Sequence, residues 1–191
     1  MTSIEQLKSL LNEKYTSEDD DEYKVELKSG LTDSQIDDLA KSLPTGKLPD
    51  EIRELLRFAS GFEFFGLEDV TFNGVGKFGF EEFFPASVQL AGDGFGNFWI
   101  IDVNQNGKWG HVFYVCHDPA VIVKHSENLA EFIKHVDEFG KRGAESNLDI
   151  IHEVTVMEIW TKSNGFISKS AALASTDEKL KSFASDLPDT F

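Results

Sequence analysis

The feature that most constrains the fold is a series of short apolar segments, separated by turns, in the middle of the chain. Four of them follow one another, at residues 87–91, 97–103, 111–115 and 120–124. Each has the length and the β-branched or aromatic content of a strand. Asn106-Gly107 lies between two of them, and this dipeptide is typical of a tight hairpin turn. Because connections this short join neighbouring antiparallel strands, the segments predict an antiparallel meander. A further short strand is expected at residues 67–72.

Apolar residues at helical spacing lie on both sides of this region and predict helices. The expected helices cover residues 3–14, 32–43, 48–58 and 126–140. Thr32 followed by Gln35 has the spacing of a capping box, and Pro49 lies in the favoured first turn of a helix. Gly140 is expected to end the fourth helix. Helices, then strands, then helices predict an α+β fold with a single central, mostly antiparallel sheet and flanking helices.

The chain of 191 residues has the length of one domain, which we divide into three parts. Residues 1–30 are expected to form an N-terminal helix and a strand near Tyr23. Residues 31–140 form the core of the domain. Residues 141–191 are expected to be an appendage packed on the same domain, with a strand at residues 154–159 and a terminal helix at residues 175–187.

The formal net charge of −16 restricts the class of partner. Nucleic-acid recognition needs Lys and Arg against phosphates, and an anionic membrane surface repels such a chain, so neither is expected as a partner. The charge favours basic protein partners, although acidity also serves solubility alone. The only cysteine is Cys116, which indicates a reducing compartment, and no signal peptide or membrane span is recognisable. We therefore expect a cytoplasmic protein.

A glycine-rich stretch precedes the second strand of the meander. A phosphate-binding loop of this kind would have to open a helix, whereas this one opens a strand. The stretch is instead expected to be a structural turn in which Asp93 and Asn97 bond nearby backbone groups. The turn residues are Gly92, Asp93, Gly94, Gly96 and Asn97.

The remaining chemical motifs point away from catalysis. Residues 102–107 match the first half of a calcium loop, but Phe113 stands where the closing acidic ligand should be. Cys116 and His117 are strand neighbours, which point to opposite faces. A hydrolase using Asp93, Asp102 and His117 remains an alternative. No catalytic residue, metal or cofactor is expected.

Four side chains are candidates for a partner-facing patch. Glu81 and Glu82 would attract a basic partner, and Trp99 and Trp109 flank the predicted hairpin, where tryptophans act as interface anchors. The alternative for both tryptophans is a place under the sheet. Most of the seventeen phenylalanines are expected in the core.

Four segments, in this order, resemble one known family. They are the Leu48-Pro49 helix that ends at Ser60-Gly61, the run from Gly92 to Asp102, the strand from His111 with the exit turn His117-Asp118-Pro119, and the closing helix from Ser126 to Ile133. The family is the SUKH superfamily, which includes the fungal cell-wall assembly regulator and many bacterial immunity proteins. The resemblance runs from about Leu31 to Phe139. Ser60 departs from the Asn that the family tends to have before Gly.

The resemblance implies an α+β fold with one central sheet, and it implies no catalysis. Bacterial members neutralise toxin domains, often nucleases, and the fungal member is a regulator that binds signalling partners through a domain with long disordered arms. We recognise no such arms in this sequence and therefore expect an immunity protein that binds a basic toxin domain. A regulator or scaffold of the fungal type is the alternative. The resemblance assigns no contact residue.

Overall fold

The computed structural model describes residues 1–17, 19–75, 83–162, 173 and 178–186. A five-stranded antiparallel sheet lies at the centre, with the order β5-β6-β7-β8-β9. Its strands are β5 (Gly74–Val75), β6 (Ser87–Gly92), β7 (Phe98–Val103), β8 (Trp109–His117) and β9 (Ala120–Ser126). Sequence order equals spatial order, so the predicted meander is confirmed. The fold is α+β, as predicted.

The turn between β7 and β8 is the predicted Asn106-Gly107 hairpin. Gly107 has a φ of 75°, a left-handed conformation in which a Cβ atom is unfavourable. Asn104 accepts hydrogen bonds from the backbone N–H groups of Asn106 and Lys108 through its Oδ1 atom, at 2.9 and 3.1 Å. An asparagine side chain therefore closes this turn, in the place where a calcium ligand would otherwise stand.

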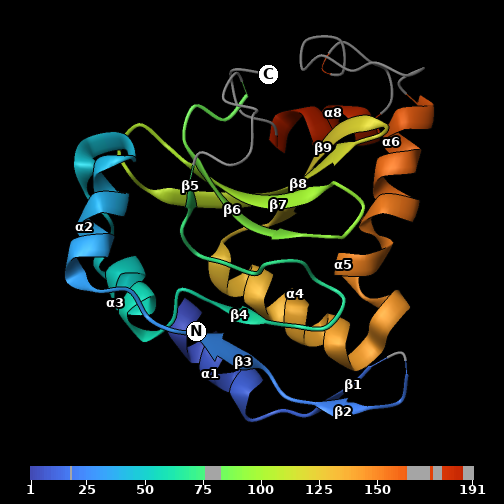
Figure 1. Ribbon diagram of the computed structural model, residues 1–191. Helices are drawn as coiled ribbons and strands as arrows, with labels where there is room; N and C mark the ends of the chain where they lie inside the picture. The colour runs from blue at the N-terminus through green and yellow to red at the C-terminus, as the bar shows by residue number, and fades with distance from the viewer. Residues whose placement is uncertain (18, 76–82, 163–172, 174–177, 187–191) are drawn as a thin grey trace.

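Helix α4 (Leu129–Arg142) packs against the sheet, as the ring contact between Trp99 and Phe132 shows. Helices α2 (Asp33–Lys41) and α3 (Asp50–Phe58) lie at one end of the sheet, while α5 (Asn147–Ile150) and α6 (Met157–Lys162) lie at the opposite end (Figure 1). Helix α1 (Ser3–Leu11) lies beside α4. No helix in the described ranges has the length and apolar character needed to cross a membrane.

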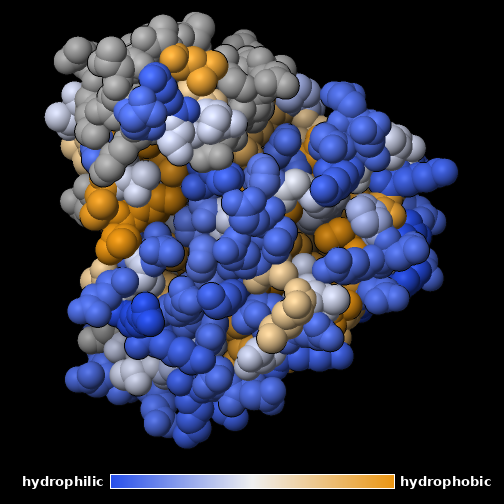
Figure 2. Space-filling model, turned by 180° about the vertical axis from the view of Figure 1, so that it is seen from behind, coloured by the Kyte–Doolittle hydropathy of each residue, from blue (hydrophilic) through white to orange (hydrophobic). Residues whose placement is uncertain are grey.

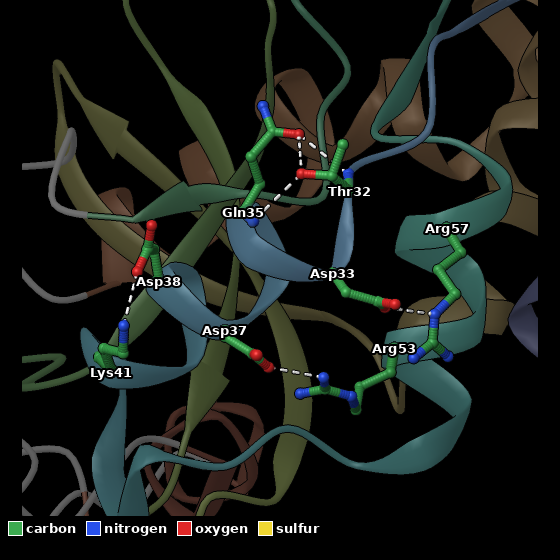
Figure 3. Close-up of polar contacts among 8 residues, drawn as sticks. All are labelled: Thr32, Asp33, Gln35, Asp37, Asp38, Lys41, Arg53 and Arg57. Atoms are coloured by element: carbon green, nitrogen blue, oxygen red, sulfur yellow. Dashed lines mark hydrogen bonds and ion pairs between the residues drawn. The ribbon is translucent and has the colours of Figure 1, made fainter.

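Polar contacts stabilise α2 and join it to α3 (Figure 3). Thr32 and Gln35 form the predicted capping box at the start of α2. Asp33 pairs with Arg57 at 2.8 Å, and Asp37 pairs with Arg53 at 2.6 Å. The hydrogen bond from Arg53 lowers the pKa of Asp37. Both arginines of α3 are therefore engaged with aspartates of the same chain.

Two small sheets complete the N-terminal part. β1 (Tyr15–Thr16) pairs with β2 (Glu22–Tyr23), and β3 (Glu26–Lys28) pairs with β4 (Gly61–Glu63). Residues 67–72 do not form the expected strand. This segment makes only two isolated bridges, from Glu68 to Gly92 and from Thr71 to Gly61. Short 3-10 turns, η1 (Pro44–Gly46) and η2 (Gly143–Glu145), link the helices.

The C-terminal part differs from the prediction. Residues 154–159 are helical and not a strand: η3 (Ile151–Val156) is a π-helical turn that continues into α6. Val156 and Ile159 are buried while Val154 is exposed, which fits one face of a helix. Helix α8 (Glu178–Asp186) falls within the terminal helix expected at 175–187. The other residues of that expected helix lie outside the described residues.

Helix α4 also runs past its predicted end at Gly140. A Cβ atom at residue 140 would lie 2.3 Å from the Tyr15 ring and 2.7 Å from the Phe64 ring. The glycine therefore permits close packing of α4 against these two aromatic rings and does not end the helix. The N-cap of α4 is Asn128, whereas Ser126 is the last residue of β9.

The core contains most of the aromatic residues, as expected from the sequence. Phe62, Phe72, Phe84 and Phe113 are among its largest fully buried side chains. The surface opposite the view of Figure 1 is mainly hydrophilic, and its apolar atoms gather in smaller patches (Figure 2). Among the described aromatic residues, Phe95 is the most exposed, with 83% of its surface accessible.

Candidate functional site

The turn from Gly92 to Asn97 is organised by the carboxylate of Asp93. Its Oδ1 atom accepts hydrogen bonds from the backbone N–H groups of Phe95 and Asn97, at 2.8 and 3.1 Å. Gly94 and Gly96, on either side of Phe95, have φ angles of 81° and 87°. Only a residue without a Cβ atom adopts these angles without strain. Asp93 and the glycines thus shape the turn in the way that the sequence predicted.

The second oxygen of Asp93 connects the turn to the sheet. Oδ2 accepts from Nδ2 of Asn97 at 2.7 Å and from the hydroxyl of Tyr114 at 2.8 Å. The Tyr114 side chain is buried in β8. Burial and then the hydrogen bond to Asp93 raise its pKa, so the phenol keeps its proton and remains a donor. All four acceptor positions of the Asp93 carboxylate are used within the chain.

Asn97 extends the hydrogen-bond network of Asp93 to His117 at the end of β8. Because its Nδ2 donates to Asp93, its Oδ1 is free to accept, and it does so from the backbone N–H and the Nδ1 of His117, at 3.0 and 2.8 Å. Because the amide oxygen of Asn97 can only accept, Nδ1 of His117 carries the proton of this hydrogen bond. A Cβ atom on Gly96 would lie 3.2 Å from the His117 ring, so the turn packs directly on the imidazole.

A hollow of about 660 Å³ opens beside this turn. One wall is the turn itself with Asp93, Phe95, His117 and Asp118. The apolar side chains that line it are Phe139, from α4, and Leu148 and Ile151, from α5 and η3. Asp149 and His152 come from the same C-terminal segment. The ionisable side chains lining the hollow in the described part of the chain are aspartate, histidine and tyrosine, with no Lys or Arg among them.

The two tryptophans predicted to face a partner lie away from this hollow. Trp99 is 2% exposed and Trp109 is 8% exposed, so both are core residues and not surface anchors. Both sheet faces are covered at β7, because the consecutive residues Trp99, Ile100 and Ile101 are all buried. On its face, Trp99 lies opposite Tyr114 with ring centroids 4.9 Å apart. Trp109 begins β8 and pairs with Val103. Glu81 and Glu82 lie outside the described residues.

The three residues of the hydrolase alternative are only partly brought together. Asp93 and His117 both contact Asn97, but Asp102 lies near the other end of β7, opposite Ser87. At about 3.4 Å per strand residue, this places Asp102 roughly 17 Å from Asn97. Burial raises the pKa of Asp102. Within the described ranges no group of three His, Cys, Asp or Glu side chains could hold a metal ion. Cys116 is buried, and burial raises the pKa of its thiol.

Sequence reasoning missed Phe95, Asp118 and Asp149 as components of a site. Phe95 was grouped with the core aromatics, but its position between two glycines in a turn was a signal, because no strand pattern includes it. Asp118 and Asp149 are thirty-one residues apart, and only the packing of α5 beside the turn brings them to one hollow.

Comparison with known proteins supports one assignment. The family model of the SMI1/KNR4 family (SUKH-1) matches residues 30–135, more than half of the chain, and includes the whole meander and the 92–97 turn. No curated protein and no solved structure matches the chain. The matched segment and the α+β fold agree with the resemblance that the sequence motifs carried, and the chain belongs to the SMI1/KNR4 family (SUKH-1).

Proposed function

We propose that this protein acts by binding a basic protein partner, as an immunity protein that neutralises a toxin domain of the nuclease type, and that it is not an enzyme. The observation that carries the proposal is the excess of carboxylates. With 34 Asp and Glu against 18 Lys and Arg, carboxylates exceed cationic side chains by 16. Membership of a family that includes immunity proteins supports the same function.

The physical reason lies in the electrostatics of a nuclease. An active site that holds phosphates is a basic cleft, and a strongly acidic protein is attracted to such a cleft at long range. Electrostatic steering raises the association rate more than it raises the final affinity. The site geometry is compatible with a binding function, because all acceptor positions of Asp93, the carboxylate at the centre of the turn, are used in hydrogen bonds within the chain.

The experiment has two stages. The tagged protein is used at low salt to capture partners from extract that contains the toxins of neighbouring cells, and the captured domain is then purified. Its association rate is measured between about 0.1 and 1 M salt, over which the screening length falls from about 10 to 3 Å. We expect a basic nuclease-like domain whose association slows steeply with salt.

Charge reversal at Glu81 and Glu82 tests the acidic surface more directly. The double variant Glu81→Lys, Glu82→Lys should associate more slowly and keep the melting temperature of the parent protein, because both residues act through the long-range field. A partner bound at the same rate at all salt concentrations would refute charge steering. Capture of cellular regulators in place of a toxin would favour the regulator function.

A further inference from the structure

We propose that the hollow beside the 92–97 turn binds a basic segment of the partner protein, with Phe95 as the aromatic anchor and with Asp118 and Asp149 as the acceptors of a Lys or Arg side chain. This inference rests on the proposed function and names the surface that performs it. Three features of the hollow carry it: an exposed ring on a rigid turn, an apolar wall, and carboxylates without cations.

The exposed ring is the first feature. Phe95 is 83% exposed, so most of its ring is available for contact with a partner. Its backbone is held by the hydrogen bond to Asp93 and by the left-handed glycines on either side. An aromatic side chain on a rigid turn is well suited to anchor a protein interface, because little backbone freedom remains to be lost on binding.

The apolar wall is the second feature. Phe139, Leu148 and Ile151 line the hollow that Phe95 borders, so a bound segment would contact apolar surface on two sides. The aliphatic stem of Lys or Arg packs well against such surfaces while its charged end reaches polar groups. The hollow therefore suits a long cationic side chain better than a short one.

The charges are the third feature. Asp118 and Asp149 line the hollow, and neither is in an ion pair within the described residues. Lys141, which lines the adjoining hollow with Asp149, is engaged with Glu13 and Asp137 at 3.2 and 2.9 Å. The chemistry of the site is that of a receptor for a cation and repels phosphates and acidic peptides.

A second hollow gives a useful contrast. It lies over β3 and β4 and is lined by acidic side chains, but also by Lys24 and Lys28, and Lys28 pairs with Asp69 at 2.6 Å. Opposite charges are thus already mixed there. Of these two hollows, the one beside the 92–97 turn combines a largely exposed ring with carboxylates and no Lys or Arg among its described lining residues.

The test is an NMR titration of the full chain with the peptide acetyl-Leu-Arg-Leu-amide. The reference ligand is the same peptide with citrulline, which is neutral and nearly isosteric with arginine. We expect shifts of the backbone amides of residues 93–97, 117 and 149, and about fivefold weaker binding of the citrulline peptide, the ratio typical of losing a charge-assisted hydrogen bond at a partly exposed site.

Matched variants separate the hollow from the general charge. Phe95→Ala and Asp118→Asn should each weaken the arginine peptide severalfold. Phe58→Ala and Glu54→Gln remove an exposed ring and one charge from α3, at the opposite end of the sheet, and should leave binding unchanged. Equal effects of all four variants, or shifts spread over the acidic surface, would overturn the inference.

Failure of this inference is distinguishable from failure of the proposed function. If the peptide does not bind and the purified toxin domain binds Phe95→Ala and parent protein equally, the hollow is not the binding surface while the proposed function stands. If no basic domain is captured but the arginine peptide binds at the hollow, the site is supported and the toxin assignment fails. Melting temperatures confirm that each variant is folded.

Discussion

The carboxylate of Asp93 should stabilise the protein far more than the side chain that closes the neighbouring turn. Asp93 and Asn104 occupy equivalent positions in two turns of one meander. Each accepts hydrogen bonds through Oδ1 from the backbone N–H groups two and four residues later. Only Asp93 uses a second oxygen, which binds Asn97 and the buried Tyr114. Asn104→Ala is therefore the matched control for Asp93→Ala.

The magnitude follows from these bonds. Each of the two exposed bonds of Asn104 contributes about 0.5 kcal/mol, so Asn104→Ala should cost about 1 kcal/mol. Bonds to a charged acceptor contribute about 1.5 kcal/mol at the low end, which suits the partly exposed Asp93. If the two Oδ1 bonds of Asp93 are counted no higher than those of Asn104, the two bonds of Oδ2 add about 3 kcal/mol, so Asp93→Ala should cost at least about 4 kcal/mol. In a domain of this size the difference is about 9 °C in melting temperature.

Urea unfolding, followed by tryptophan fluorescence, measures both free energies. Tyr114→Phe completes a double-mutant cycle with Asp93→Ala, and we expect a coupling energy of about 1–2 kcal/mol between the two sites. Equal unfolding free energies of the Asp93→Ala and Asn104→Ala variants would refute the reasoning. So would a coupling energy of zero, because the hydroxyl of Tyr114 would then stabilise the fold without Asp93.

Three further predictions follow from the packing. Burial lowers the pKa of His125 to about 3 and also lowers that of His135, so the unfolded state binds more protons below pH 6.5. The free energy of unfolding should have its full value above pH 6.5 and fall below it by up to about 1.4 kcal/mol per pH unit for each histidine. His125→Phe should reduce this pH dependence between about pH 6.5 and 5. Glu26 and Glu63 lie directly opposite in β3 and β4, so Glu63→Lys should stabilise the protein by about 0.5 kcal/mol, and a lower midpoint in urea would contradict this. Gly140→Ala should lower the melting temperature despite the higher helix propensity of alanine, because the new methyl group meets Tyr15; a higher melting temperature would show that propensity dominates.

The sequence predicted the parts of the fold that local signals determine. The meander was recognisable because each turn carries its own signal, such as Asn106-Gly107, and the start of α2 because Thr32 and Gln35 cap it. The prediction of a strand at residues 154–159 was wrong. The β-branched residues at 154 and 156 suggest the alternation of buried and exposed side chains in a strand, whereas Val156 and Ile159 share the buried side of a helix. A pattern of three residues cannot distinguish the two periods.

Of the candidate site, only the 92–97 turn could be predicted from the sequence, because its contacts are local in the chain. The shape of the 92–97 turn follows from Asp93 and its glycines, which interact over four residues. The hollow needs α5, which lies some fifty residues later and reaches the turn only through the packing of α4. The burial of Trp99 and Trp109 was equally hidden, because coverage of both sheet faces is a property of the assembled fold.

The link between Tyr114 and Phe95 has a consequence for how binding strength is set. Phe95 is fixed by Asp93, and Asp93 is fixed by a phenol inside the core, so the turn is ordered when the chain folds and not when a partner arrives. In a protein that lacks the phenol hydroxyl, the turn would sample other conformations, and apparent affinity would fall in proportion to the remaining competent fraction. Tyr114→Phe should therefore weaken partner binding through loss of preorganisation of the 92–97 turn.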